Sequence, residues 1–286
     1  MEWTTAKRFV IVLLVILNVA LAGLNMKQKQ DNTMTSAQEK AIFEVLSQNG
    51  ITLYTDLNIA AQPAYRLEAR VPTYKKEELE SAFFDGEKTK VSMGTQTTYK
   101  TEAKTLVLAG DKGTFLDSSV AKGAEVLSKE EAVKQAERKA EVLKPKFGNL
   151  VLSYVSSTEE GWEVEFSGVY NGETIFSNQF TVFISDHGIY QLTFTYCEIT
   201  GVSREKKDIC MIDEALLTFM REWNQQENST NAAIQKIELG YDLLEQGGAA
   251  AGTGLFLEPC YRIYLMGEPK PYLVNAYTCQ IVNKER

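Results

Sequence analysis

The feature that most constrains this chain is an apolar segment close to its start. Between residues 9 and 26 every side chain is apolar or small except Asn18 and Asn25, and Lys7 and Arg8 precede the segment. In an α-helix of about 1.5 Å per residue the segment extends about 27 Å, close to the roughly 30 Å of a bilayer's hydrocarbon core. The sequence therefore predicts a transmembrane helix at residues 9–26, after a short tail at residues 1–8.

A cleaved export signal is the alternative interpretation of this segment. The basic start, the apolar middle and Ala20-Leu21-Ala22, which fits an A-x-A cleavage site, are typical of signal peptides. A lipoprotein signal is excluded, because Leu24 rather than a cysteine follows Gly23. Basic residues are nearly balanced across the segment, so they do not orient it. We expect a single-pass anchor in the cell membrane, with a cytoplasmic N-terminus and extracytoplasmic C-terminal domains, and cleavage remains the alternative.

The rest of the chain is long enough for two domains of ordinary size. We predict a first extracytoplasmic α+β domain at residues 33–118 and a second domain at residues 122–286. The net charge of -8, with no basic cluster beyond the membrane edge, argues against nucleic acid as a partner.

Two capping boxes predict where helices begin. In a capping box, the first side chain accepts a hydrogen bond from a backbone N–H three residues later, and the later side chain bonds back. Ser36 and Glu39 fit this pattern before an apolar 3–4 spacing, and Ser128 and Glu131 fit it again. The sequence therefore predicts helices that begin at these two serines.

The second of these helices is predicted to end at Pro145 and Gly148, and residues 211–223 form a third helix. Strand-like segments follow each helix, which suggests a duplicated unit of a helix and then strands, at about residues 128–200 and 208–283. The apolar stripe of the third helix consists of Ile212, Leu216, Phe219, Met220 and Trp223.

Apolar residues alternate along residues 162–195 and predict an antiparallel meander of three strands. We place three-residue loops at Tyr170-Asn171-Gly172 and Asp186-His187-Gly188, because this register brings the apolar faces together. The fold class is therefore α+β. The predicted opposed pairs are Phe166–Phe176, Trp162–Phe180, Phe180–Phe194, Val182–Leu192 and Ile184–Tyr190.

No group of residues in the sequence fits a catalytic or metal site. His187 is the only histidine and falls at a predicted hairpin tip, and the cysteine spacings match no zinc pattern. Residues 201–205 lack the second glycine of a nucleophile elbow. The glycine-rich residues 245–257 lack the Lys-Ser/Thr of a phosphate-binding loop. We predict no catalytic residue, no cofactor and no metal.

The cysteines of an exported chain can form disulfides. The segment from Cys260 to Cys279 is symmetric about Pro269-Lys270, and a hairpin folded there sets the two cysteines directly opposite one another, within disulfide range. We predict this pair as a disulfide candidate. Reduced, half-buried thiols are one alternative, and a pair of Cys197 with Cys210 is another.

The two asparagines of the membrane segment predict a contact face. On a helix Asn18, Ala22 and Asn25 share one face, and Ile11 and Val15 continue it. An amide that faces lipid is costly, whereas against another helix it can hydrogen-bond, and a small residue such as Ala22 lets two backbones approach closely. We therefore predict that this face contacts another transmembrane helix.

The start of the chain, "MEWTTAKRFVIVLLVILNVALA", resembles that of the YycI (WalI) family, in which a short M-[DE]-W-x-x-x-K tail runs into one apolar helix that contains an asparagine. The matching residues are Met1, Glu2, Trp3, Lys7 and Asn18. The segment "LSQNGITLYTDL" is similar to the first extracytoplasmic segment of that family. The later helix-then-strands units are similar to the PepSY-like units of YycI and of its relative YycH.

The resemblance implies a non-enzymatic, membrane-anchored accessory protein. Such a protein associates with a YycH-like partner and the WalK (YycG) sensor histidine kinase, and modulates the WalK/WalR (YycG/YycF) two-component system that governs cell-wall metabolism. Two alternatives remain open. One is an exported PepSY-like protein that inhibits or chaperones a peptidase after its signal peptide is cleaved, and the other is an enzyme of unknown type.

Overall fold

The structure is a computed structural model of the 286-residue chain. It describes residues 7, 10–11, 13–21, 32–87, 89–93, 96–123, 127–226, 231–243, 254–268 and 270–282. The labelled helices are α2 (Ser36–Gln48), α3 (Lys76–Phe83), α4 (Lys129–Phe147) and α5 (Ile212–Asn224). The strands are β1 (Ile51–Leu53), β2 (Ala64–Arg70), β3 (Lys90–Met93), β4 (Thr97–Lys100), β5 (Lys104–Ala109), β6 (Lys112–Asp117), β7 (Asn149–Thr158), β8 (Gly161–Tyr170), β9 (Glu173–Ser185), β10 (Gly188–Thr195), β11 (Glu198–Lys207), β12 (Ala232–Leu243), β13 (Leu255–Leu265), β14 (Tyr272–Asn275) and β15 (Gln280–Ile281).

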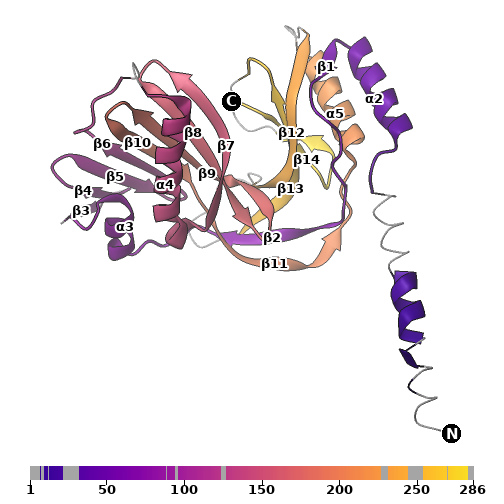
Figure 1. Cartoon of the computed structure of the whole chain (residues 1–286), viewed down its shortest axis with the longest axis horizontal. Helices are drawn as coiled ribbons and strands as arrows, with labels where there is room; N and C mark the ends of the chain where they lie inside the picture. Colours follow the sequence, from indigo (N-terminus) through magenta and orange to yellow (C-terminus); the bar gives the residue numbers. More distant parts are fainter. Residues whose placement is uncertain are drawn as a thin grey trace. The chain divides into compact units, whose positions relative to one another are not determined.

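The fold class is α+β, as predicted, and most strand pairs are antiparallel (Figure 1). Residues 13–21, inside the predicted membrane segment, are helical. Among the described residues, no helix is at once long enough and apolar enough to cross a membrane. Residues 9, 12 and 22–26 of that segment lie outside the described residues.

The chain forms two compact units, and each is assembled from segments that are distant in sequence. Unit 1 comprises residues 1–64, 206–239 and 259–286, and unit 2 comprises residues 65–205 and 240–258. This division differs from the predicted one, since the boundary placed between residues 118 and 122 falls inside unit 2. The physical reason is that β6 pairs with β10, which joins the two sides of that boundary in one sheet.

Unit 2 is built on an antiparallel sheet in which neighbouring strands run in the order β7-β8-β9-β10-β6-β5-β4-β3. Helix α4 packs against β7 to β10 and against α3 (Figure 1). Its buried face consists of Ala132, Ala136, Ala140, Leu143 and Phe147. Three alanines on this face allow the helix to approach the sheet closely.

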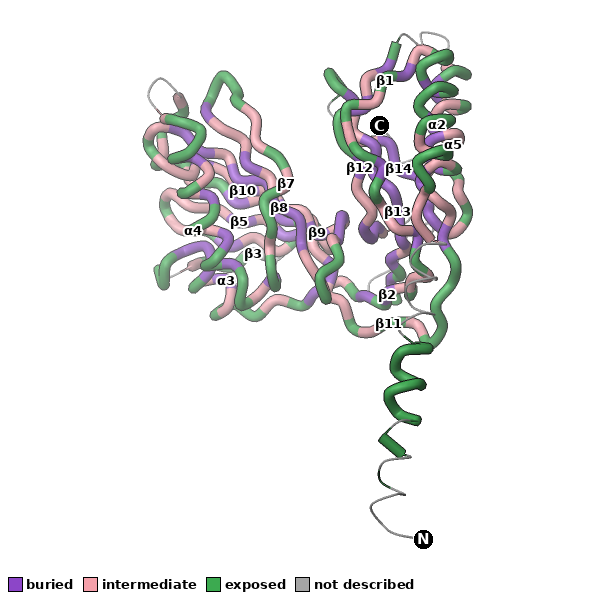
Figure 2. The backbone as a smooth tube through the Cα atoms, turned by 45° about the vertical axis from the view of Figure 1, so that its right-hand side comes forward, coloured by how far each residue is buried: buried purple, intermediate pink, exposed green. Residues whose placement is uncertain are grey.

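Aromatic rings fill the space between α4 and the sheet of unit 2. The ring centroid of Phe147 lies 4.8 Å from that of Phe180, 5.2 Å from that of Phe194 and 5.1 Å from that of Tyr196. Figure 2 shows buried positions along β8, β9 and β10, interspersed with intermediate ones. The helix and the meander therefore share one core.

The predicted register of the meander is right for two of the three pairs between β9 and β10, where the turn has two residues rather than the predicted three, and is wrong between β8 and β9. Phe180 faces Phe194 and Val182 faces Leu192, as predicted, but a bulge at Tyr190 sets Ile189, not Tyr190, opposite Ile184.

Between β8 and β9, the predicted pair Phe166–Phe176 is wrong. Phe166 faces Phe180, and Trp162 faces Ile184 rather than Phe180. The turn at Asn171-Gly172 has two residues, both with positive φ, and an irregularity in β9 just before Gln179 then resets the register. This shift keeps the apolar faces together.

Unit 1 joins the beginning of the folded chain to its end. Strand β1 pairs in parallel with β12, with Ile51 opposite Ala232 and Leu53 opposite Ile234. Helix α2 packs against β1 and α5, and α5 packs against β14 and β15 (Figure 1). The core of unit 1 includes Ile42, Leu46, Ile51, Leu216, Phe219, Ile234, Tyr261, Ile263 and Val274.

The helix ends test the predicted capping boxes. Ser128 and Glu131 form the predicted capping box of α4. The predicted box of Ser36 and Glu39 is wrong by one position, because Thr35 is the N-cap of α2 and exchanges hydrogen bonds with Gln38.

Helix α4 does not end at Pro145, which lies inside its last turn. It ends at Gly148, whose φ of +75° is readily adopted by glycine. The apolar stripe of the third helix is confirmed in α5, where Ile212, Leu216, Phe219 and Trp223 are buried and Met220 is half-buried.

Candidate functional site

The N-terminal helix exposes an unusual amount of apolar surface. Its described large apolar side chains are 50% to 67% exposed, from Leu21 at 50% to Val19 at 67%. Contiguous exposed apolar surface marks a site of membrane or protein contact. The set comprises Val10, Ile11, Leu13, Leu14, Val15, Ile16, Leu17, Val19 and Leu21.

Asn18 is the polar position within the described residues 10–11 and 13–21 of this helix. Its side-chain amide Nδ2 donates to the backbone oxygen of Leu14 at 2.9 Å. This bond satisfies one donor within the helix and leaves the amide oxygen exposed as an acceptor. Ala22 and Asn25, the other two residues of the predicted contact face, lie outside the described residues.

Unit 2 presents a second apolar surface at strand β7. This strand pairs only with β8 among the described strands, so it is an edge of the sheet. Val151, Leu152 and Tyr154 on this edge are 44%, 43% and 56% exposed. A ten-residue edge strand with exposed apolar side chains offers unpaired backbone groups to another chain.

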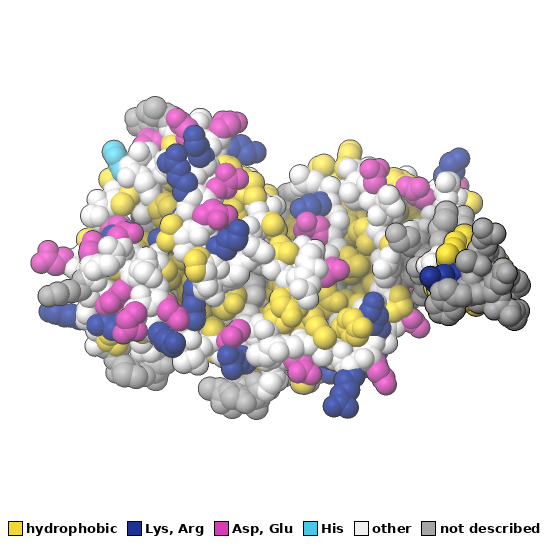
Figure 3. Space-filling view, turned by 60° about the horizontal axis from the view of Figure 1, so that its bottom comes forward, with side chains coloured by type: hydrophobic (Ala, Val, Ile, Leu, Met, Phe, Trp, Pro, Cys, Tyr) yellow, Lys and Arg dark blue, Asp and Glu magenta, His cyan; other side chains and the backbone are white. Residues whose placement is uncertain are grey.

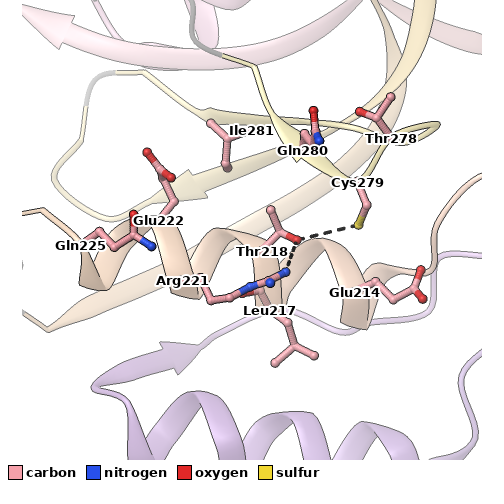
Figure 4. A pocket seen from close by; sticks show the side chains of 10 residues that line it. All are labelled: Glu214, Leu217, Thr218, Arg221, Glu222, Gln225, Thr278, Cys279, Gln280 and Ile281. Atoms are coloured by element: carbon pink, nitrogen blue, oxygen red, sulfur yellow. Dashed lines mark hydrogen bonds between the residues drawn. The ribbon is translucent and has the colours of Figure 1, made fainter.

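Unit 1 contains a cleft of about 720 Å³ between helix α5 and the last described turn and strand of the chain (Figure 4). The helix contributes Glu214, Leu217, Thr218, Arg221, Glu222 and Gln225, and the C-terminal segment contributes Thr278, Cys279, Gln280 and Ile281. The lining mixes charged, polar and apolar groups, so it fits a polar rather than a purely apolar ligand.

A hydrogen-bonded row crosses the floor of the cleft (Figure 4). The Arg221 guanidinium Nη2 donates to Thr218 Oγ1 at 3.1 Å, and Thr218 Oγ1 lies 3.9 Å from Cys279 Sγ. At the opposite end of the helix, Glu214 accepts a hydrogen bond from the backbone N–H of Met211 at 3.1 Å, which caps the first turn of α5.

Two cysteines and a carboxylate converge beside this row. The ligand atoms of Cys210, Glu214 and Cys279 all lie within 4.8 Å of one another. Burial, followed by hydrogen bonding with Cys279, raises the pKa of the Cys210 thiol well above its usual range. Cys279 has a φ of +53°, a left-handed conformation that is uncommon for a residue with a side chain.

The structure corrects the predicted pairing of Cys260 with Cys279. Cys260 lies opposite Asn275, because the chain turns at Gly267, with a φ of +82°, rather than at Pro269-Lys270. Cys279 then falls in the turn after β14, where its thiol lies close to that of Cys210 rather than that of Cys260. Nothing in the local sequence indicates this encounter, because it depends on that register.

The alternative pair of Cys197 with Cys210 places its members in different units. Cys197 is buried in unit 2, where both its backbone N–H and its thiol donate to Asn178 Oδ1, at 2.8 and 3.2 Å. Burial raises the pKa of Cys197 to about 12, so this thiol is protonated at neutral pH.

The single histidine lies where the sequence predicts it. His187 is exposed at the turn between β9 and β10, and it is the cyan side chain at the surface in Figure 3. Figure 3 also shows acidic and basic side chains interspersed over the visible face. Most of the glycine-rich residues 245–257, namely 245–253, lie outside the described residues.

These features define an α+β protein of helix-and-antiparallel-sheet units, preceded by a helix with an exposed apolar surface. The chain belongs to the YycI family, because the family model described as "YycI protein" matches residues 29–277. The family is one of regulatory proteins. The comparison with curated proteins gives no match.

Two solved structures match this chain at low sequence identity. The crystal structure of an uncharacterized protein from Eubacterium rectale ATCC 33656 matches with a TM-score of 0.56 and 13% identity, over 82% of this chain and 91% of that one. The C-terminal domain of YpeB from Bacillus megaterium matches with a TM-score of 0.42 and 12% identity, over 75% of this chain and 97% of that one. The first of these likenesses shows the fold alone.

The position of Cys279 depends on the turn at Gly267, and this dependence predicts the effect of two glycine substitutions. Gly267→Ala is expected to destabilise the protein by about 1 to 2 kcal/mol, because alanine disfavours positive φ. A Cβ at Gly267 meets no atom within 4 Å, so the cost arises from the backbone alone. Urea unfolding of the full chain measures this change.

Gly254→Ala is the matched control, because a Cβ there also meets nothing within 4 Å and the φ of Gly254 is not positive. Its effect is expected to stay within about 0.5 kcal/mol. Equal effects of the two substitutions would contradict the observed turn.

Proposed function

We propose that this protein is a non-enzymatic, membrane-anchored accessory protein that modulates a sensor histidine kinase of the WalK (YycG) type. The observation that carries the proposal is the match of the YycI family model to residues 29–277, nearly the whole folded part of the chain. The controlled pathway is then the WalK/WalR (YycG/YycF) two-component system of cell-wall metabolism, and a YycH-like protein is the second partner.

The exposed apolar helix supports the membrane anchor. Its described side chains are apolar except at Lys7 and Asn18. Exposing such an apolar surface to water is unfavourable. In this proposal residues 9–26 span the membrane, the N-terminus is cytoplasmic, and the two units are extracytoplasmic. The helix-and-sheet units then act as PepSY-like contact modules.

The connection between the anchor and unit 1 supports a role in signalling. Residues 22–31 separate the N-terminal helix from the described part of unit 1, and α2 packs directly against α5 and β1. In this proposal the anchor acts on unit 1 through its covalent connection to α2, whose residues Ile42 and Leu46 belong to the core of that unit.

Two leucine substitutions test the role of the anchor. Asn18→Leu with Ala22→Leu is expected to weaken co-purification with the kinase or the YycH-like protein by about 3- to 30-fold, which corresponds to about 0.6 to 2 kcal/mol for an interhelical hydrogen bond. Kinase output, measured with a reporter of the response regulator, is expected to change, whereas membrane insertion is expected to persist.

Ala20→Leu is the control for the added leucine, because residue 20 lies on the opposite side of the helix from Asn18 and the change adds the same volume as Ala22→Leu. Association unchanged by the double substitution would contradict the contact face. A mature N-terminus at Gly23 would contradict the anchor and favour the exported peptidase inhibitor or chaperone.

The apolar edge of unit 2 is proposed as the extracytoplasmic contact with the YycH-like protein. Leu152→Lys is expected to weaken that association about tenfold, because a lysine on an edge strand opposes pairing with another chain. Leu116→Lys on β6, where Leu116 is 44% exposed, adds the same charge to unit 2 on a strand that is paired on both sides, with β10 and β5, and is expected to have no effect. Pull-down at several partner concentrations measures both, and equal effects would contradict this surface.

A further inference from the structure

We infer that Cys210 and Cys279 form a disulfide that ties the start of helix α5 to the C-terminal turn. The two thiol sulfurs lie within 4.8 Å of one another in the same unit. A change of side-chain rotamers can close such a separation when the backbones are already adjacent.

Backbone hydrogen bonds hold the two cysteines close together. The Cys210 N–H donates to the oxygen of Ala276 at 2.7 Å, and the Cys279 N–H donates to the oxygen of Asn275 at 2.8 Å. Cys279 therefore closes a tight turn that begins at Asn275, and the next residue of that turn, Ala276, accepts the hydrogen bond from Cys210. The Tyr261 hydroxyl also donates to the Cys210 oxygen at 2.8 Å, which fixes this segment against the core.

The other two cysteines are less suited to pairing. Cys260 is 0% exposed in the core of unit 1 and faces Asn275 across the sheet. Cys197 is buried in unit 2 with its thiol bonded to Asn178. Cys279, by contrast, lines the cleft and is reachable by an oxidant (Figure 4).

A disulfide accounts for this cluster better than a metal ion does. The cluster brings together three ligand atoms, whereas a structural zinc site needs four. One of the three residues, Glu214, already caps α5 through the Met211 N–H. A disulfide needs only the two sulfurs.

The oxidation balances with a disulfide as the oxidant, such as that of a thiol–disulfide oxidoreductase or a small-molecule disulfide. The half-buried Cys279, which lines the cleft, loses its proton and attacks one sulfur of the oxidant, which releases the first thiol. Cys210 loses its proton and displaces the second thiol as the bond to Cys279 forms. Two electrons and two protons pass to the oxidant, which leaves as two thiols.

The disulfide would make the cleft of unit 1 sensitive to redox conditions. Cys279 stands beside Thr218 and Arg221, so a covalent link to Cys210 holds the C-terminal wall of the cleft at a fixed distance from α5. Reduction releases this wall. The inference concerns the residues of unit 1 alone and does not depend on which kinase the protein regulates.

The test uses the full chain purified from membranes in detergent, with free thiols blocked by N-ethylmaleimide at lysis and a second sample treated with oxidised glutathione. Non-reducing digestion and mass spectrometry are expected to give one cross-linked peptide that joins Cys210 to Cys279. Oxidation is expected to raise the melting temperature by about 5 °C or more, because the bond closes a long loop.

Cys210→Ser and Cys279→Gly are each expected to abolish the oxidation-dependent shift, and Cys260→Ala is expected to retain it. Cys279→Gly also suits the left-handed backbone at that position, so it guards against a variant that fails to fold. Free or separately glutathionylated thiols, a bond to Cys197 or Cys260, or one equivalent of zinc on both thiols would overturn the inference.

Discussion

The parallel pairing of β1 with β12 is the constraint on which the organisation of the protein depends. It places Ile51 opposite Ala232 and extends through hydrogen bonds from Tyr54 to the Ile234 oxygen and from Ala232 to the Gly50 oxygen. Parallel neighbours need a long connection between them, and here that connection contains most of unit 2. The first helix of the folded chain therefore completes a core formed mainly by its last third. As a result, unit 1 forms only when both ends of the chain are present.

This arrangement explains why the proposed functional features concentrate in unit 1. The N-terminal helix, the cleft beside α5 and the cysteine pair all belong to the chain segments that make up unit 1. Unit 2 has its own core, in which α4 and aromatic rings cover an antiparallel sheet, and its exposed edge strand is suited to a contact of its own. In the proposed function, unit 1 is continuous with the anchor segment and unit 2 carries the partner surface.

The sequence predicts features that depend on neighbouring residues. The capping box at Ser128 and the buried stripe of α5 are confirmed, because the interactions that set them join residues only three or four positions apart in one helix. The register around Phe166 and the turn at Gly267 could not be predicted, since both depend on bulges and left-handed residues chosen by packing. The encounter of Cys210 with Cys279 and the composition of the units depend on pairings between distant segments, for which local patterns carry no information.

Peptide-resolved hydrogen exchange of the full chain in rising urea tests the central claim most directly, because it measures which segments open together. The account predicts that amides of β1 and α2 are protected and open in the same cooperative step as those of α5 and β12, at a urea concentration that can differ from that of α4 and β8–β10. Rapid exchange of β1 in water, or opening of α2 and β1 well before α5, would show that the start of the folded chain is not part of the core of unit 1 and would contradict the account.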